Sequence, residues 1–197
     1  MKLIDVISSI ICGAVIGILL TDFMQEWGIA IGFYSVFLWM AAALVSLICL
    51  YIAYLISKKI FFVFQVAKFL LVGAFATVID LKFFEFLIWL FALFISLNYT
   101  VAKSISFLFA TSIKYWGNKY WAFGKHEKEG SKEIIQFFMV TLVGLVIDVG
   151  FFYYFTKITG PQFGASNALW IKISVIFAAI MAAIWNFLGY KFLVFKK

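Results

Sequence analysis

Residues 28–57 read GIAIGFYSVFLWMAAALVSLICLYIAYLIS and contain no charged side chain. About 20 consecutive apolar residues are enough for one helix to cross the hydrocarbon core of a bilayer. Apolar runs of this kind fill the chain, since 66% of its residues are hydrophobic and 13% are charged, and the mean hydropathy is +1.10. A soluble domain carries about 25% charged residues. The composition therefore predicts an all-α membrane protein and excludes a water-soluble fold.

Apolar segments on either side of this run predict about six transmembrane helices. They lie at about residues 3–24, 28–57, 68–96, 100–123, 134–156 and 169–195. With the N-terminus inside the cell, the outer links offer mainly Lys157, and the other loop and terminal lysines fall in cytoplasmic segments. These cytoplasmic lysines are Lys2, Lys58, Lys59, Lys125, Lys128, Lys132, Lys196 and Lys197. Since cytoplasmic segments of membrane proteins carry the excess of lysine, we expect a multi-pass protein of the cytoplasmic membrane with both termini in the cytoplasm.

The net charge of +7 is the balance of 16 basic residues, all of them lysines, against 9 acidic residues. These lysines are scattered at helix ends, without the basic groove or aromatic platform that nucleic-acid binding requires. Cys12 and Cys49 lie inside apolar runs without histidine nearby, where a thiol behaves as a small hydrophobic group. The sequence therefore predicts no nucleic-acid partner, no metal site and no cofactor.

Two pairs of segments repeat each other. Residues 69–80 (FLLVGAFATVID) align without gaps to residues 137–148 (FFMVTLVGLVID), and both end in Val-Ile-Asp. Residues 117–123 (GNKYWAF) align in the same order to residues 189–195 (GYKFLVF). Self-similarity of this kind indicates an internal repeat.

The repeat predicts the domain organisation. Residues 1–66 form two N-terminal transmembrane helices to which the sequence assigns no role. Residues 67–197 form a four-helix transmembrane domain of two helical hairpins, at about residues 67–124 and 134–197. Because each hairpin crosses the membrane twice, both enter from the same side, which is a parallel arrangement known among transporters.

Each hairpin places one aspartate, Asp80 or Asp148, about 11 residues into its first helix, which is near the middle of the bilayer at about 1.5 Å per residue. A charged side chain there costs about 2.5 to 3.5 kcal/mol on insertion scales. Lys82 points to another face than Asp80, although it can pair with Glu85 three residues later. Asp80 therefore needs a partner from another helix. Such acids are candidates for substrate binding, with a structural bond between helices as the alternative.

The second helix of each hairpin supplies lysines and amides. In the first hairpin, Lys103, Lys114 and Asn118 lie close to one stripe of the helix. In the second hairpin, Lys172 and Asn186 lie on nearly one face. We expect these groups to face the aspartates and to continue a polar path.

Lys119 and Lys191 lie near the cytoplasmic helix ends beside aromatic residues. An ammonium group at this depth can meet lipid phosphate. The alternative for both lysines, and for Lys103 and Lys172, is that they extend to the membrane surface as topology anchors. The polar residues together suit a lipid with an anionic head group.

These motifs resemble the GtrA-like family of small membrane proteins. The family pattern is a Phe-x-x-Val-Gly start, an acidic or amide residue in the first helix and an Asn-Arg-x-Trp-x-Phe ending. The ending reads NKYWAF at residues 118–123, and the later half ends in NFLGYKFLVF at residues 186–195. The resemblance covers about residues 68–197, with lysine in place of arginine at Lys119 and with Lys114 in the place that Asn186 holds in the later half.

The resemblance implies translocation of a polyprenyl-phosphate-linked monosaccharide across the cytoplasmic membrane, for cell-surface polysaccharide or teichoic acid glycosylation. A polyprenyl-phosphate glycosyltransferase would be the partner, and membrane lipids would surround the protein. The expected sugar contacts are Asp80, Asp148, Asn118 and Asn186. The expected phosphate contacts are Lys103, Lys114, Lys119, Lys172 and Lys191.

Two other functions stay open. One is a noncatalytic anchor or assembly subunit that docks the glycosyltransferase, with the first two helices as its contact. The other is a membrane-embedded enzyme, which ranks last because the sequence has no Asp-x-Asp pair, serine–histidine set or metal cluster. We therefore expect no enzymatic activity. A homodimer that completes the polar groove is also open.

Overall fold

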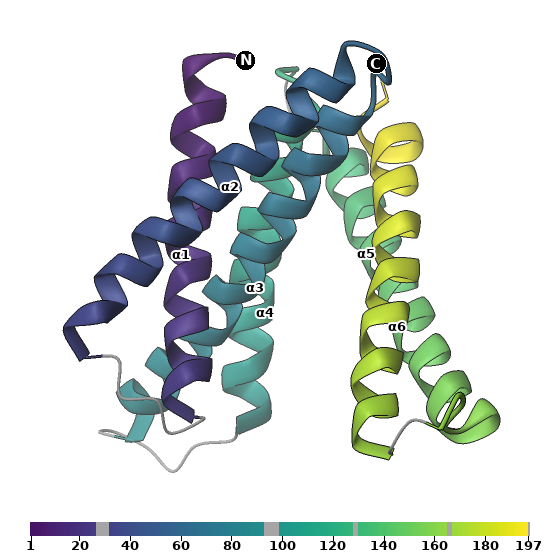
Figure 1. Cartoon of the computed structure of the whole chain (residues 1–197). Helices are drawn as coiled ribbons and strands as arrows, with labels where there is room; N and C mark the ends of the chain where they lie inside the picture. The colour runs from purple at the N-terminus through teal and green to yellow at the C-terminus, as the bar shows by residue number, and fades with distance from the viewer. Residues whose placement is uncertain (27–31, 93–98, 128–129, 165–166, 197) are drawn as a thin grey trace. The chain divides into compact units, whose positions relative to one another are not determined.

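The computed structural model describes residues 1–26, 32–92, 99–127, 130–164 and 167–196 (Figure 1). Within these residues the chain forms six α-helices, which confirms the predicted all-helical fold. They are α1 (Leu3–Glu26), α2 (Ser35–Ser57), α3 (Val63–Ala92), α4 (Tyr99–Trp116), α5 (Ser131–Tyr153) and α6 (Asn167–Gly189). A short 3-10 helix, η1 (Gly32–Tyr34), precedes α2.

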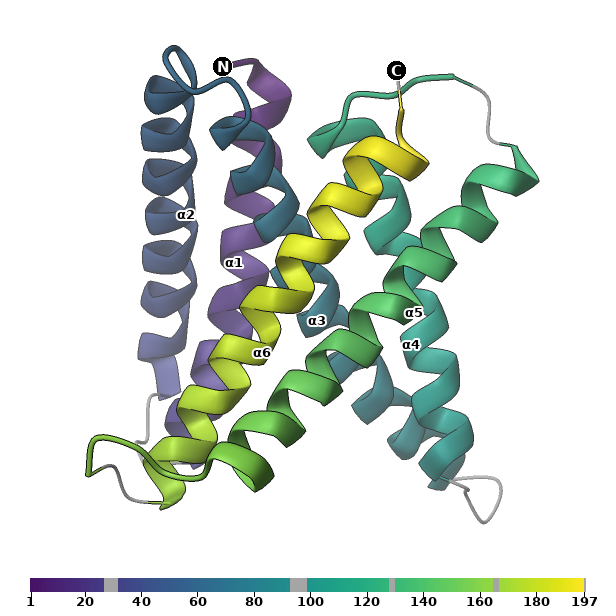
Figure 2. The same cartoon turned by 90° about the vertical axis from the view of Figure 1, so that its right-hand side faces the viewer.

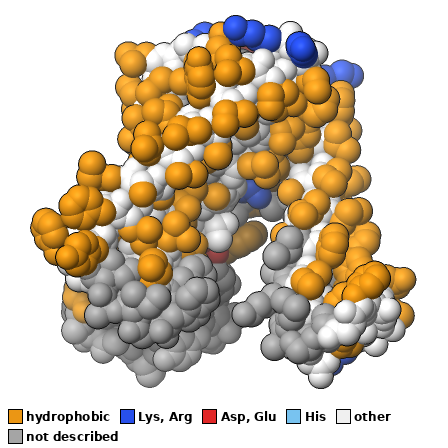
Figure 3. Space-filling view, viewed as in Figure 1, with side chains coloured by type: hydrophobic (Ala, Val, Ile, Leu, Met, Phe, Trp, Pro, Cys, Tyr) orange, Lys and Arg blue, Asp and Glu red, His pale blue; other side chains and the backbone are white. Residues whose placement is uncertain are grey.

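Four of the described helices are long and apolar enough to cross a membrane. They contain the segments Leu3–Asp22, Gly32–Ser57, Ser131–Thr159 and Phe177–Val194. Large apolar side chains point outward from them, since Phe33, Met40 and Val146 are 79%, 64% and 65% exposed. Figure 3 shows hydrophobic side chains over the flanks of α1 and α2, and lysines gathered at the end where α1 begins. Lipid tails solvate such a surface and water does not, so the chain is a multi-pass membrane protein.

The other two long helices, α3 and α4, carry half of the charged residues of the predicted transmembrane segments. Helices α3 and α5 begin at Val63 and Ser131, a few residues before the predicted starts at 68 and 134. Hydropathy marks the apolar part of a helix, whereas backbone hydrogen bonds continue into its polar ends. For the same reason Lys157, predicted in an outer link, lies in a helical turn.

Three helices continue into π-helical turns. These turns are η2 (Gly117–Ala122) after α4, η3 (Tyr154–Thr159) after α5 and η4 (Tyr190–Val194) after α6. A Cβ atom at Gly117 would lie 2.9 Å from Val72 Cγ1, and one at Gly189 would lie 2.5 Å from Val140 Cγ1. Glycine therefore lets the end of each second helix approach the first helix of its hairpin closely.

The chain divides into two compact units, Met1–Gly124 and Lys125–Lys197. In the first unit, α1 and α2 pack against each other (Figures 1 and 2). Small residues line their contact. The hydroxyl of Ser46 donates to the backbone oxygen of Ser9 at 2.7 Å. A Cβ atom at Gly13 would lie 2.7 Å from the Ala42 backbone oxygen, so the two backbones are in close contact. Small residues at such a crossing let membrane helices pack tightly.

The second unit is the antiparallel hairpin of α5 and α6. Tyr190 is fully buried and stacks on Phe137, with ring centroids 4.5 Å apart. Its hydroxyl lies 2.7 Å from the hydroxyl of Thr141. The indole of Trp185 donates to the Val140 backbone oxygen at 3.1 Å. These contacts join η4 and α6 to the first half of α5.

Candidate functional site

Asp80 lies on α3 and takes its partner from α4. The Ser106 hydroxyl donates to Asp80 Oδ1 at 2.7 Å, and Ser106 is fully buried. The expectation that Asp80 finds a partner on another helix is therefore confirmed. The sequence analysis did not propose Ser106 itself, although it lies three residues after Lys103 and so on the same face of the helix.

Asp148 lies at the same distance from the first residue of α5 as Asp80 does from the first residue of α3. It is half-buried. Among the described residues it makes no hydrogen bond and no ion pair. A carboxyl group inside an apolar helix is unfavourable unless a polar partner or water reaches it.

Asn118 is fully buried in η2. Its Nδ2 donates to the Lys114 backbone oxygen at 2.8 Å. Its Oδ1 is buried and has no hydrogen-bond partner within the described part of the chain. Buried polar atoms are nearly always satisfied, so this oxygen marks a place for a donor.

Lys119, the next residue, is also fully buried. Its Nζ donates to the Tyr115 hydroxyl at 3.4 Å, and it lies 5.6 Å and 5.7 Å from the ring centroids of Tyr115 and Tyr120. Aromatic faces stabilise an ammonium group in a site without water. The buried position argues against the alternative that Lys119 is an exposed anchor.

Asn186 lies on α6 against Gly144 of α5. A Cβ atom at Gly144 would come within 2.7 Å of Asn186 Nδ2, so a side chain at this position would collide with the amide. Asn186 Oδ1 is the other buried side-chain oxygen that lacks a partner in the described residues. Both amides predicted to contact substrate thus carry an unsatisfied oxygen.

The remaining predicted residues are lysines. Lys191 in η4 is half-buried, with Nζ 5.7 Å and 5.4 Å from the ring centroids of Phe187 and Phe192. Lys114 is half-buried on α4. The side chains of Lys103 and Lys172 lie outside the described part of the structure.

A buried cluster around Asp5 was not expected from the sequence. Lys68 Nζ lies 2.5 Å from Asp5 Oδ1, and the Trp121 indole donates to the same oxygen at 3.0 Å. The backbone nitrogen of Lys2 donates to Asp5 Oδ2 at 2.8 Å. The sequence shows that Asp5 is an acid in the first turn of an apolar helix. It does not indicate the partners Lys68 and Trp121, because they lie far along the chain.

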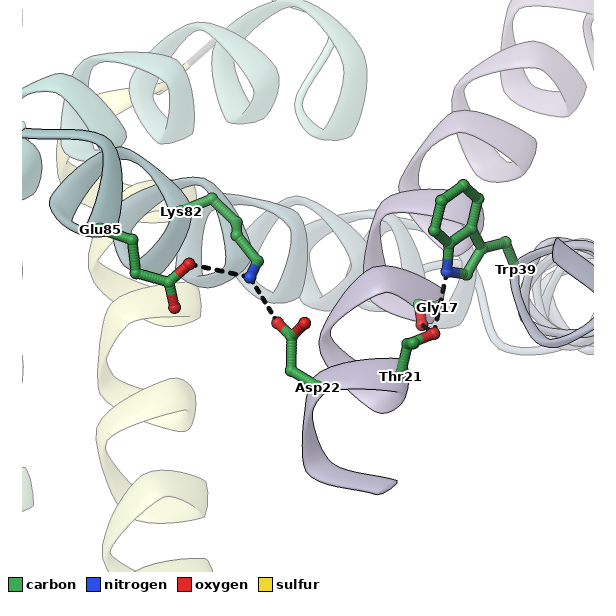
Figure 4. Close-up of polar contacts among 6 residues, drawn as sticks. All are labelled: Gly17, Thr21, Asp22, Trp39, Lys82 and Glu85. Atoms are coloured by element: carbon green, nitrogen blue, oxygen red, sulfur yellow. Dashed lines mark hydrogen bonds and ion pairs between the residues drawn. The ribbon is translucent and has the colours of Figure 1, made fainter. Parts of the chain in front are cut away.

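A second group of charges joins the other end of α1 to α3 (Figure 4). Lys82 Nζ lies 2.9 Å from Glu85 Oε2, which confirms the predicted pair, and 2.6 Å from Asp22 Oδ2. Nearby, the Trp39 indole donates to Thr21 Oγ1 at 2.9 Å. The first helix is thus attached to both α2 and α3.

Residues 68–195 match the model of the family described as GtrA/DPMS, transmembrane domain. The chain belongs to this family. GtrA-family membership implies a role in glycosylation pathways that use polyprenyl-phosphate sugars, and GtrA-like membrane domains are generally noncatalytic. Neither a curated protein nor a solved structure matches the chain. Helices α1 and α2 lie outside the residues matched to the GtrA family.

Proposed function

We propose that this GtrA-family protein moves a polyprenyl-phosphate-linked monosaccharide across the cytoplasmic membrane, for glycosylation of cell-surface polysaccharide or teichoic acid. The sugar contacts are Asp80, Asp148, Asn118 and Asn186, and the phosphate contacts are Lys103, Lys114, Lys119, Lys172 and Lys191. Both termini lie in the cytoplasm, beside a polyprenyl-phosphate glycosyltransferase.

The unsatisfied oxygens of Asn118 and Asn186 carry the proposal. Each is a buried acceptor without a donor in the described residues. A sugar has several hydroxyl groups that can donate to these oxygens. A bound sugar would replace the water that each amide oxygen otherwise needs as a donor. Lys119 beside Asn118 adds a cation for the phosphate.

Buried polar side chains along α4 and η2 support a path through the apolar layer. Ser106, Thr111, Asn118 and Lys119 are all buried, and the distance from Ser106 to Asn118 is about 18 Å at about 1.5 Å per helical residue. The sugar and phosphate need such polar contacts, whereas the polyprenyl tail is already soluble in lipid. Asp80 of α3, which accepts from Ser106, adds a carboxylate to this path.

Matching details in the two hairpins support the internal repeat. Val72 and Val140 are equivalent in the sequence alignment, and they contact the equivalent glycines Gly117 and Gly189. Each glycine is followed by a π-helical turn, and such turns are frequent at functional sites.

The test is a transport assay with the pure protein in liposomes. A radiolabelled polyprenyl-phosphate sugar is placed in one leaflet, and its exposure to a membrane-impermeant probe is timed. We expect the wild type to accelerate exposure, and Asp80→Ala, Asp148→Ala and Asn118→Ala each to slow it by about tenfold or more, since each removes a polar contact inside the membrane.

Ser174→Ala is the matched control, because the buried Ser174 hydroxyl donates to the backbone oxygen of Trp170 in its own helix. Its transport rate should equal that of the wild type. Normal rates in all three folded site variants would contradict the assigned contacts. A folded wild type that moves no lipid would favour the alternative, a noncatalytic assembly subunit for the glycosyltransferase.

A further inference from the structure

Asp5 of α1 lies outside the matched GtrA residues, yet it contacts two residues within them. It is 2% exposed. Its Oδ1 pairs with Lys68 Nζ at 2.5 Å and accepts from the Trp121 indole at 3.0 Å. Lys68 lies near the start of α3 and Trp121 in η2, so one carboxylate joins the two ends of the first hairpin. The start of a helix also favours a negative charge.

Lys68 depends on this carboxylate. Its side chain is 12% exposed, and its Nζ lies 4.3 Å from the ring centroid of Phe64 and 5.7 Å from that of Trp121. The rings help to hold the cation but do not neutralise it. Removing one partner of a buried ion pair leaves an uncompensated charge, which is strongly unfavourable.

Trp121 links Asp5 to the candidate site. It belongs to the same π-helical turn as Asn118 and Lys119. Because the three residues share one helical turn, the hydrogen bond that holds the Trp121 ring also constrains the backbone that carries Asn118 and Lys119. The Lys119 ammonium and the unsatisfied Asn118 oxygen are oriented by this turn.

A second ion pair between α1 and α3 allows the contact of Asp5 with η2 to be distinguished from simple attachment of α1 to α3. At the other end of α1, Asp22 pairs with Lys82 at 2.6 Å (Figure 4). Both acids fasten α1 to α3, but the described contacts of Asp22 do not include η2. Asp22 is therefore the natural control for Asp5.

We infer that Asp5 is a positioning residue for the phosphate-binding end of the site: it holds Trp121 and Lys68, and through η2 it orients Lys119. The ligand class, a polyprenyl phosphate, rests on the function proposed above. Helix α1 then helps to position residues of the transport domain, in addition to anchoring the chain in the membrane.

The experiment uses the full chain in nanodiscs with ¹⁵N-labelled indoles. The signal of Trp121 among the seven tryptophans is assigned with Trp121→Phe, and farnesyl phosphate is the titrated probe. In Asp5→Asn we expect the Trp121 signal to move upfield, because an amide oxygen is a weaker acceptor than a carboxylate, and farnesyl phosphate to bind about tenfold more weakly. Asp5→Glu should restore part of both values.

Because Asp5→Asn leaves Lys68 unpaired, the neutral pair Asp5→Asn/Lys68→Gln is measured beside it. This pair removes both charges but still lacks the carboxylate acceptor, so the same signal shift and weaker binding are expected. Asp22→Asn should leave both values unchanged, and farnesol, which lacks the phosphate, should bind the wild type and Asp5→Asn equally.

Three results would overturn the inference: an unchanged Trp121 signal in both Asp5 variants, a shifted signal with unchanged affinity, or a wild type that does not bind farnesyl phosphate. Failure of the transport proposal is distinguishable from these. A wild type that binds farnesyl phosphate with the expected dependence on Asp5, but moves no lipid in liposomes, contradicts transport and leaves the role of Asp5 standing.

Discussion

Buried and half-buried polar residues of this protein differ in whether their side-chain atoms find hydrogen-bond partners. Asp80 accepts from Ser106 of another helix, and Asp5 accepts from Trp121 and pairs with Lys68. Asn118 keeps an unsatisfied oxygen in the described structure. In surroundings of low polarity a hydrogen bond to a carboxylate is strong, whereas a buried oxygen without a donor is costly. The bonds from Ser106 and Trp121 therefore hold the two carboxylates in place, whereas the Asn118 oxygen can still gain a bond from a ligand.

Ser106→Ala tests how much the hydrogen bond between Ser106 and Asp80 stabilises the protein. The variant removes the hydroxyl that donates to Asp80, so we expect it to lower the free energy of unfolding by about 1 to 2 kcal/mol. The measurement is reversible unfolding by sodium dodecyl sulfate in mixed micelles. Ser106→Thr retains the hydroxyl and should lose less, and Ser174→Ala should lose little. Equal losses in Ser106→Ala and Ser174→Ala would show that the bond to Asp80 adds no stability.

At the scale of elements, close helix contacts depend on residues without large side chains. Helix α1 approaches α2 at Gly13 and Gly17, where an added Cβ atom would lie 2.7 Å from Ala42 O and from Trp39 Cα, respectively. These neighbours are backbone atoms, which cannot move aside unless the helices separate. The π-helical ends of α4 and α6 use glycine in the same way against α3 and α5.

Gly13→Ala should therefore destabilise the α1–α2 contact by about 1 to 3 kcal/mol, because the extra methyl group has no space. Thermal unfolding in detergent is the measurement. Gly150→Ala is the control, since an added Cβ atom there meets nothing within 4 Å, and alanine has the higher helix propensity. The control should match or exceed the wild type in stability. A Gly13→Ala protein as stable as the wild type would refute the close contact.

For the whole molecule, the lysine distribution predicts how the chain is oriented in the membrane. Four helices qualify as spans by length and composition, while α3 and α4 carry the polar groups of the first hairpin. If all six helices cross, the α2–α3 turn and the α4–α5 connection share the cytoplasmic side with both termini.

Single cysteines introduced in a Cys12→Ala/Cys49→Ala background test this orientation. With a membrane-impermeant maleimide on intact cells, we expect labelling of Ser96→Cys, between α3 and α4, and of Gln162→Cys, between α5 and α6. Lys59→Cys and Glu127→Cys should be labelled after the cells are opened. Protection of Ser96→Cys on intact cells, with Gln162→Cys labelled, would mean that α3 and α4 do not cross.

Much of the fold was predictable because its cause is local. Apolar segments long enough to span a bilayer predict helices wherever they occur, and the i, i+3 pair of Lys82 and Glu85 follows from helix geometry alone. The need of Asp80 for an interhelical partner was predictable for a similar reason, since an acid without a partner is costly in the middle of the membrane. The identity of that partner, Ser106, was not, because it depends on the rotation of α4 about its axis.

The sequence by itself determined the membrane class, the six helices, the GtrA family and the aspartates, amides and lysines of the candidate site, since these follow from composition, periodicity and motif. Tertiary structure alone decided that Asp5 meets Lys68 and Trp121, that Lys119 is buried, and that the Asn118 and Asn186 oxygens lack partners in the described residues. The physical reason is the separation along the chain of the residues that interact. Hydropathy acts on neighbours along the chain, whereas burial and hydrogen bonding between Asp5 and Trp121 arise only when helices far apart in sequence pack together.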